Sequence, residues 1–163
     1  MNKITRVSPT ANQIGKLSVL SWNIQDSSDK TLGSKLTDET FIKTIAQAQI
    51  FCLQETKKCI KIPGYKCYNS LRKNSRSGGI CIGVKHQLKH LVTPIKTKEL
   101  SRDTQAVKIS RKVSNLNKDT ILVNMYDSPE LSSYKKKLID AGQYEETLEN
   151  LDNFLTFQKK ITF

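Results

Sequence analysis

The chain has 163 residues, enough for one domain with a hydrophobic core and too few for two comfortable ones. Hydrophobic residues make up 37% of it, which is low for a compact α/β enzyme but not low enough to indicate disorder. The formal net charge of +12 favours a polyanionic partner, nucleic acid above all, over an acidic membrane surface. A Lys- and Asn-rich composition without functional meaning would produce the same charge.

Residues 1–15 are polar and lack the apolar run of a secretory signal. No apolar run approaches the roughly 20 residues that cross a bilayer. We therefore expect a soluble intracellular protein, in the nucleus or cytoplasm, not secreted and without a membrane partner. The four cysteines show no CxxC pattern, which argues against a zinc site, and Cys52 and Cys81 lie in apolar runs typical of a core.

Residues 1–16 are expected to form a flexible lead-in, and residues 17–163 a single unit. An apolar run over 17–22 predicts the first strand, and a polar loop follows over 26–35. Thr37 or Asp38 can cap the next helix, whose apolar face includes Phe41, Ile42 and Ile45. A second strand is predicted over 50–54, so the opening of the chain predicts a β-α-β unit.

Four more strands and a final helix are predicted downstream. The strands cover 64–68, 79–84, 105–109 and 120–125, with a basic loop over 57–63 and a polar turn over 72–78. The spacing of the last three strands favours an antiparallel meander over further β-α-β units. Apolar periodicity predicts a helix over 143–158, with acidic residues early and lysines late, as the helix dipole favours.

Two of the strand-like runs end on a polar residue, Asn23 after the first and Glu55 after the second. Residues at the carboxyl ends of strands in open α/β sheets lie at the edge where ligands and metals bind. Amide and carboxylate oxygens suit a hard cation such as Mg²⁺, whose remaining positions are filled by water and substrate phosphate. The sequence therefore predicts a phosphate-handling metal site with Asn23 and Glu55 as ligands.

Four short motifs occur in order, each at the end of a predicted strand or beside one: Ser21-Trp22-Asn23, Gln54-Glu55-Thr56-Lys57, Ser77-Gly78-Gly79-Ile80 and Asn124-Met125-Tyr126-Asp127-Ser128-Pro129. Together they resemble the endonuclease/exonuclease/phosphatase superfamily, and within it the endonuclease domains of LINE-type retrotransposons, which are relatives of apurinic/apyrimidinic endonucleases. The resemblance runs from about residue 17 to 158 and corresponds to the N-terminal part of the family's domain. It implies an α+β fold, a partial four-layer α/β/β/α sandwich of the DNase-like type, with a mixed, largely antiparallel sheet and outer helices.

The resemblance also implies roles for individual residues. Glu55 matches the family's metal-binding glutamate, and Asn23 matches the asparagine that supports the metal and catalytic hydrogen bonds. Tyr126 matches the tyrosine that hydrogen-bonds the scissile phosphate. Arg102 resembles an arginine that binds backbone phosphate in some members, and Lys57 is placed near the metal, where a cation would help hold substrate. The implied cofactor is Mg²⁺, with Mn²⁺ as a substitute, and the implied partner is DNA.

The family's general base and second acidic group come from a Gly-Asp-x-Asn motif and a Ser-Asp-His motif, and neither occurs in this sequence. His86 and His90 do not meet the His-Glu-x-x-His pattern of metalloproteases and are expected on the surface. We therefore expect a truncated endonuclease domain that is weak or inactive alone and exposes an apolar sheet face, which a second polypeptide segment would cover. A phosphatase of the same superfamily, a non-catalytic basic module that binds nucleic acid, and an inert remnant are the alternatives.

Overall fold

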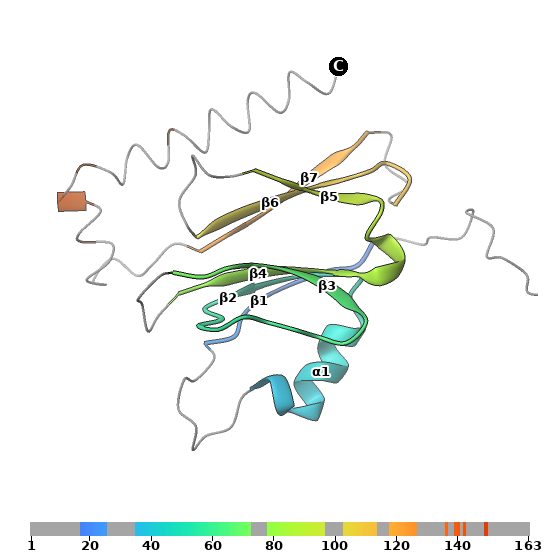
Figure 1. Ribbon diagram of the computed structural model, residues 1–163, viewed down its shortest axis with the longest axis horizontal. Helices are drawn as coiled ribbons and strands as arrows, with labels where there is room; N and C mark the ends of the chain where they lie inside the picture. Colours follow the sequence, from blue (N-terminus) through green and yellow to red (C-terminus); the bar gives the residue numbers. More distant parts are fainter. Residues whose placement is uncertain are drawn as a thin grey trace, which may run out of the picture.

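The computed structural model describes residues 17–25, 35–72, 78–96, 103–113 and 118–126, together with the single positions 136, 139, 140, 142 and 149. Two β-sheets lie face to face, and a helix covers the outer face of one of them (Figure 1). The elements in chain order are β1 (Val19–Asn23), the 3-10 helix η1 (Lys35–Thr37), α1 (Glu39–Ala46), β2 (Ile50–Gln54), β3 (Tyr65–Ser70), β4 (Ile80–Lys85), the 3-10 helix η2 (His86–Leu88), β5 (Val92–Ile95), β6 (Thr104–Ile109) and β7 (Thr120–Met125).

The first sheet has the strand order β1-β2-β4-β3, and the second has the order β5-β6-β7. β1 and β2 are parallel, whereas every other pairing is antiparallel. The α+β class with a mixed, largely antiparallel sheet is therefore confirmed. The helix expected over 143–158 lies outside the described residues, apart from Glu149. In the described part of the chain, no helix has the length and apolar character needed to span a bilayer.

The expected meander of the last three strands is wrong in its first member. β4 pairs with β2 and β3 in the first sheet, while β6 pairs with β5 and β7 in the second. Five of the six residues of β4 are buried, so this strand needs apolar cover on both faces and a central place in a sheet. The sequence pattern also did not predict β5, a four-residue strand that contains Pro94 and lies at the edge of its sheet, where proline is tolerated.

Helix α1 connects the parallel strands β1 and β2, so the predicted β-α-β opening is confirmed. Asp38 caps the helix, because its carboxylate accepts a hydrogen bond from the backbone N–H of Phe41 at 2.9 Å. Phe41 and Ile45 are buried beneath the helix. The Phe41 ring centroid also lies 5.2 Å from that of Trp22, which ties α1 to the strand that ends at Asn23.

Alternating side chains of β2 divide the core into two clusters. Phe51 and Leu53 belong to the cluster beneath α1, while Ile50 and Cys52 belong to the cluster between the two sheets. Because side chains alternate between the faces of a strand, burial on both faces requires an uninterrupted apolar run. Cys52 and Cys81 are both buried, as expected for core residues.

Gly83 of β4 lies opposite Phe51 of β2 in the antiparallel register. A Cβ atom at position 83 would lie 2.0 Å from Cζ of the Phe51 ring. The ring therefore occupies the space that any side chain at this position would need, and glycine is required by this close approach.

We expect Gly83→Ala to lower the free energy of unfolding by about 1–3 kcal/mol, because the added methyl group overpacks the core against Phe51. Urea unfolding followed by the fluorescence of Trp22 measures the change. The matched control is the double variant Phe51→Leu/Gly83→Ala, whose cost should be smaller than the sum of the two single costs. Additive costs would contradict the proposed contact.

Candidate functional site at the strand ends

Two of the predicted site residues meet at the carboxyl ends of the parallel strands β1 and β2. Asn23 is the last residue of β1 and lies beside Gln54 in the register, so Glu55 follows directly next to it. The Asn23 side-chain amide donates to Oε1 of Glu55 at 3.2 Å. Its Oδ1 accepts from the backbone N–H of Gln25 at 3.2 Å, so Asn23 is held in place and orients the carboxylate of Glu55.

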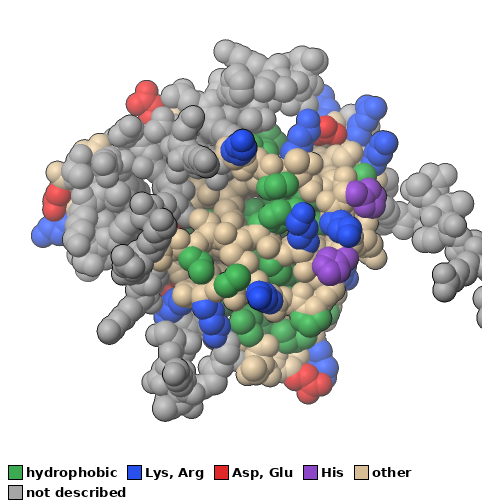
Figure 2. All heavy atoms as spheres, viewed as in Figure 1, with side chains coloured by type: hydrophobic (Ala, Val, Ile, Leu, Met, Phe, Trp, Pro, Cys, Tyr) green, Lys and Arg blue, Asp and Glu red, His purple; other side chains and the backbone are tan. Residues whose placement is uncertain are grey.

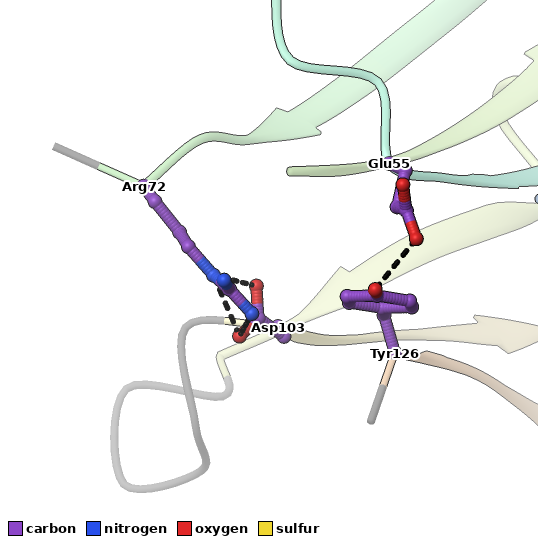
Figure 3. Close-up of polar contacts among 4 residues, drawn as sticks. All are labelled: Glu55, Arg72, Asp103 and Tyr126. Atoms are coloured by element: carbon purple, nitrogen blue, oxygen red, sulfur yellow. Dashed lines mark hydrogen bonds and ion pairs between the residues drawn. The ribbon is translucent and has the colours of Figure 1, made fainter. Parts of the chain in front are cut away.

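Tyr126 brings the second sheet to the same carboxylate. It follows β7, and its hydroxyl donates to Oε1 of Glu55 at 2.6 Å (Figure 3). Glu55 thus accepts hydrogen bonds from residues that come from opposite sheets and are 32 and 71 positions away in the sequence. We call Asn23, Glu55 and Tyr126 the strand-end site.

The backbone at this site adopts conformations that side chains disfavour. Gln25, Glu55 and Lys57 have φ angles of 43°, 54° and 52°, and they are the non-glycine residues with positive φ in the described part of the chain. Such conformations cost free energy and persist where the surrounding structure imposes them, often at functional sites. Lys57, predicted to hold substrate, lies two residues beyond Glu55 in this segment, half-buried.

The segment that carries Glu55 is held against the two glycines of the third motif. The N–H groups of Thr56 and Lys57 donate to the carbonyl oxygens of Gly79 and Gly78 at 3.1 and 2.9 Å. Both glycines have positive φ, and a Cβ atom at Gly79 would lie 2.8 Å from the buried Oγ1 of Thr56. The glycines therefore serve the geometry of this segment, as expected for a turn into a strand.

A buried ion pair lies beside the strand-end site (Figure 3). Arg72 donates from Nε to Oδ1 of Asp103 at 2.8 Å and from Nη2 to Oδ2 at 2.5 Å, and the two side chains are only 6% and 3% exposed. The guanidinium carbon lies 5.8 Å from the centroid of the Tyr126 ring, and the Asp103 carbonyl accepts from the Tyr126 N–H at 3.0 Å. The pair therefore joins the end of β3 to the start of β6 and supports Tyr126.

Asn124 joins the two sheets beneath the site. This side chain is 2% exposed, and its amide nitrogen donates to the carbonyl oxygens of Leu53 and Cys81, both at 3.2 Å. Its Oδ1 accepts a hydrogen bond from Nε2 of Gln54 at 2.6 Å, and Nε2 of Gln54 also donates to Oγ of Ser21 at 3.2 Å. The polar network therefore crosses from β7 to β1 and fixes how the sheets lie relative to each other.

Sequence reasoning missed three of these supporting residues. Arg72 falls in the predicted polar turn over 72–78, Asp103 has no predicted role, and Asn124 appears only within the fourth motif. Their partners are 31 to 71 positions away, so no local pattern indicated them. Arg102 itself lies outside the described residues.

The hydroxyl of Tyr126 is a donor at neutral pH. Burial, the hydrogen bond to Glu55 and the negative charge of Glu55 raise the pKa of Tyr126 to about 12, and the Arg72 guanidinium offsets part of this effect. A protonated phenol can donate to a phosphate oxygen without adding charge. This is the chemistry that the sequence resemblance implies for Tyr126.

The strand-end site offers a hard divalent cation one carboxylate ligand, and this meets only part of what such an ion needs. Glu55 supplies a carboxylate at the strand ends, whereas both oxygens of Asp103 accept hydrogen bonds from Arg72. The described residues contain no group of three or more His, Cys, Asp or Glu that could hold a metal ion. Mg²⁺ is often bound through one or two carboxylates and otherwise by water and substrate, so Glu55 would be its main protein ligand. His86 and His90 are exposed and lie beyond the far end of β4, away from this site.

Similarity between this chain and known proteins is found among solved structures. No protein-family model matches the chain, and no curated protein matches it. The crystal structure of the catalytic domain of APE2 from Xenopus laevis is similar, with a TM-score of 0.48 and 17% sequence identity. The match covers 82% of this chain and 51% of that chain, so this chain spans about half the length of that domain. At this level the likeness identifies neither substrate nor activity.

We expect Tyr126 to titrate at a pH of about 12, whereas an unperturbed tyrosine titrates near pH 10. The phenolate absorbance of the chain minus that of Tyr126→Phe isolates this group among the five tyrosines. Because the raised pKa belongs to the folded state, the protonated phenol of Tyr126 stabilises the folded chain. This contribution to the free energy of unfolding is complete below about pH 10 and is lost as the pH rises towards 12. In Glu55→Gln the transition should move to lower pH, and an unchanged transition would contradict the contact.

We expect Arg72→Ala to lower the free energy of unfolding by about 3–5 kcal/mol, because it leaves the buried carboxylate of Asp103 without its partner. The double variant Arg72→Met/Asp103→Leu should recover most of this loss, since no unpaired charge is then buried. Lys43→Ala, which breaks an ion pair with Glu39 whose side chains are 70% and 82% exposed, is the control and should change stability by less than about 0.5 kcal/mol. Urea unfolding measures all three variants.

Proposed function

We propose that the chain is the N-terminal part of a Mg²⁺-dependent, phosphodiester-hydrolysing endonuclease domain of retrotransposon type within the endonuclease/exonuclease/phosphatase superfamily. The resemblance assigns Asn23, Glu55 and Tyr126 to one site. The observation that supports the proposal best is that Asn23 and Tyr126 both donate to the same carboxylate oxygen of Glu55. Three residues from three separate motifs would not be expected to meet in this way unless the motifs belonged together.

The proposed chemistry divides among the residues of the strand-end site. Glu55 would hold Mg²⁺, or Mn²⁺ in its place, and the metal would supply Lewis-acid polarisation of the phosphoryl group. Asn23 would keep the carboxylate oriented, as it does in this structure. The Tyr126 hydroxyl would donate to a non-bridging phosphate oxygen and so stabilise the charge that grows there. Lys57 would attract the phosphate backbone to the strand ends.

Hydrolysis also needs a base that takes the proton of the attacking water while the bond from phosphorus to the leaving oxygen breaks. In the family that this chain resembles, the base comes from motifs that do not occur in this sequence. We therefore propose that the chain supplies the metal and phosphate half of the site, and that on its own it hydrolyses DNA weakly or not at all. A second polypeptide segment would complete the site.

The metal half of this proposal is tested with Mn²⁺, whose paramagnetism quenches tryptophan fluorescence. Trp22 is the single tryptophan and directly precedes Asn23, so it reports on the strand ends. Saturable quenching is expected for the chain and should be lost in Glu55→Gln. The control Glu39→Gln, which removes an exposed carboxylate on α1, should bind as the unaltered chain does. Absence of saturable quenching of Trp22 in the unaltered chain, or equal quenching in Glu55→Gln, would overturn the proposal.

Nicking of supercoiled plasmid with Mg²⁺, compared with EDTA and with Glu55→Gln, tests the hydrolytic half. Metal-dependent nicking that Glu55→Gln abolishes would show that this half-site is sufficient. Metal binding without nicking would agree with the need for a second segment, and adding the missing motifs should then restore nicking. Faster hydrolysis of small phosphate esters than of plasmid would favour a phosphatase, whereas DNA binding without any metal effect would favour a non-catalytic module.

A further inference from the structure

The end of the sandwich opposite the strand-end site carries a second group of functional side chains. β4 starts at Ile80, next to the glycines that hold the Glu55 segment, and ends at Lys85. At about 3.3 Å per residue, its two ends are about 17 Å apart. β6 runs the same way, from the neighbourhood of Asp103 to Ile109, so the segments that follow both strands lie away from Glu55.

Basic residues from these two segments gather at this end, and we call them the distal basic surface: Lys85, His86, Lys89, His90, Arg111 and Lys112. All are exposed except Lys85, which is half-buried. A hydrogen bond of 2.9 Å from the Ser110 N–H to the Leu91 carbonyl holds the two segments together. Figure 2 shows the two histidines of the chain at this end with lysine and arginine side chains around them.

One acidic residue of the described chain, Asp119, lies at the distal basic surface, and its charge is paired. Asp119 accepts a hydrogen bond from the backbone N–H of Arg111 at 2.9 Å and pairs with Nζ of Lys108 at 3.1 Å. These contacts, the backbone hydrogen bond first, lower the pKa of Asp119, so the carboxylate is charged at neutral pH. Lys108 and Asp119 offset each other, and the remaining lysines and Arg111 leave the surface positive.

The residues beneath the distal basic surface form a packed apolar core. Leu88, Val92, Ile109 and Val113 are each at most 2% exposed and belong to the core between the sheets. None of the large hydrophobic residues that are exposed in the described chain belongs to this surface. Binding in a membrane interface requires an apolar face beside the basic one, so this arrangement suits a soluble polyanion instead.

We propose that the distal basic surface binds the phosphate backbone of a nucleic acid, without metal and without the strand-end site. The cations come from two short segments, and several of their side chains are long and flexible. Such groups recognise regularly spaced phosphates rather than base edges, so binding is independent of base sequence. The surface lies at the opposite end from Glu55, so it adds a second nucleic-acid contact to a chain whose first is proposed at Glu55. It does not depend on the proposed hydrolysis.

The test compares two variants that each lose three positive charges. Lys89→Gln/Arg111→Gln/Lys112→Gln removes cations of the distal basic surface, and Lys43→Gln/Lys61→Gln/Lys96→Gln removes three exposed lysines elsewhere. Affinity for a short fluorescein-labelled DNA duplex is measured by anisotropy in EDTA across a salt series. Each lost phosphate contact should reduce the slope of log K against log salt by about 0.9, so the first variant should lose up to about 2.7 and bind at least about tenfold more weakly at low salt. The second should retain the slope.

Equal losses in the two variants would overturn the proposal, because net charge alone would then explain the binding. No loss in the first variant would do the same, as would binding to vesicles of anionic lipid but not to DNA. Because binding is measured in EDTA, its outcome does not depend on the metal site proposed at Glu55. Thermal unfolding confirms that each variant is folded, and its substitutions leave the buried core untouched.

Discussion

The carboxylate of Glu55 makes a polar contact with each of the two sheets of this protein. One of its oxygens accepts from Asn23 of the first sheet and from Tyr126 of the second. Glu55 accepts from both with a backbone φ of 54°, directly after the end of β2. This conformation is unfavourable by itself, so hydrogen bonds from the next two residues to Gly79 and Gly78 must maintain it.

The polar groups around Glu55 also determine how the sheets are placed. Apolar side chains between sheets attract one another without a strong preference for one alignment, whereas a buried amide or ion pair is stable in one arrangement only. Asn124 reaches across the core to carbonyl oxygens of two strands, and Arg72 joins Asp103 from the other sheet. Displacing either sheet would leave these groups buried without partners, which costs more than the hydrogen bonds themselves contribute.

The two ends of the sandwich differ in chemistry because strands of opposite direction deliver different segments to them. Parallel β1 and β2 deliver Asn23 and Glu55 to one end, while antiparallel β4 and β6 deliver the segments of the distal basic surface to the other. One end combines a carboxylate, a phenol and strained backbone. The other combines exposed cations over a rigid core, and so it offers charge without the geometry of a reactive site.

Much of the local structure was predictable from short-range patterns. Asp38 three residues before Phe41 predicts the start of α1, and the apolar runs before Asn23 and Glu55 predict the parallel strands whose ends lie side by side. The order of four motifs then pointed to Tyr126 as a third member of the site. The partners of β4 were not predictable in this way, because an apolar run shows that a strand is buried and not which strands flank it.

The sequence by itself determined every described strand except β5, the helix α1 and the polar residues that follow β1 and β2, because these depend on neighbouring residues. Only the tertiary structure decided that Arg72 pairs with Asp103, that Asn124 bridges two strands of the opposite sheet, and that Gly83 leaves room for Phe51. Such contacts join residues that are tens of positions apart. They form only when two sheets stack in one register, and buried polar groups select that register because every other one leaves them unsatisfied.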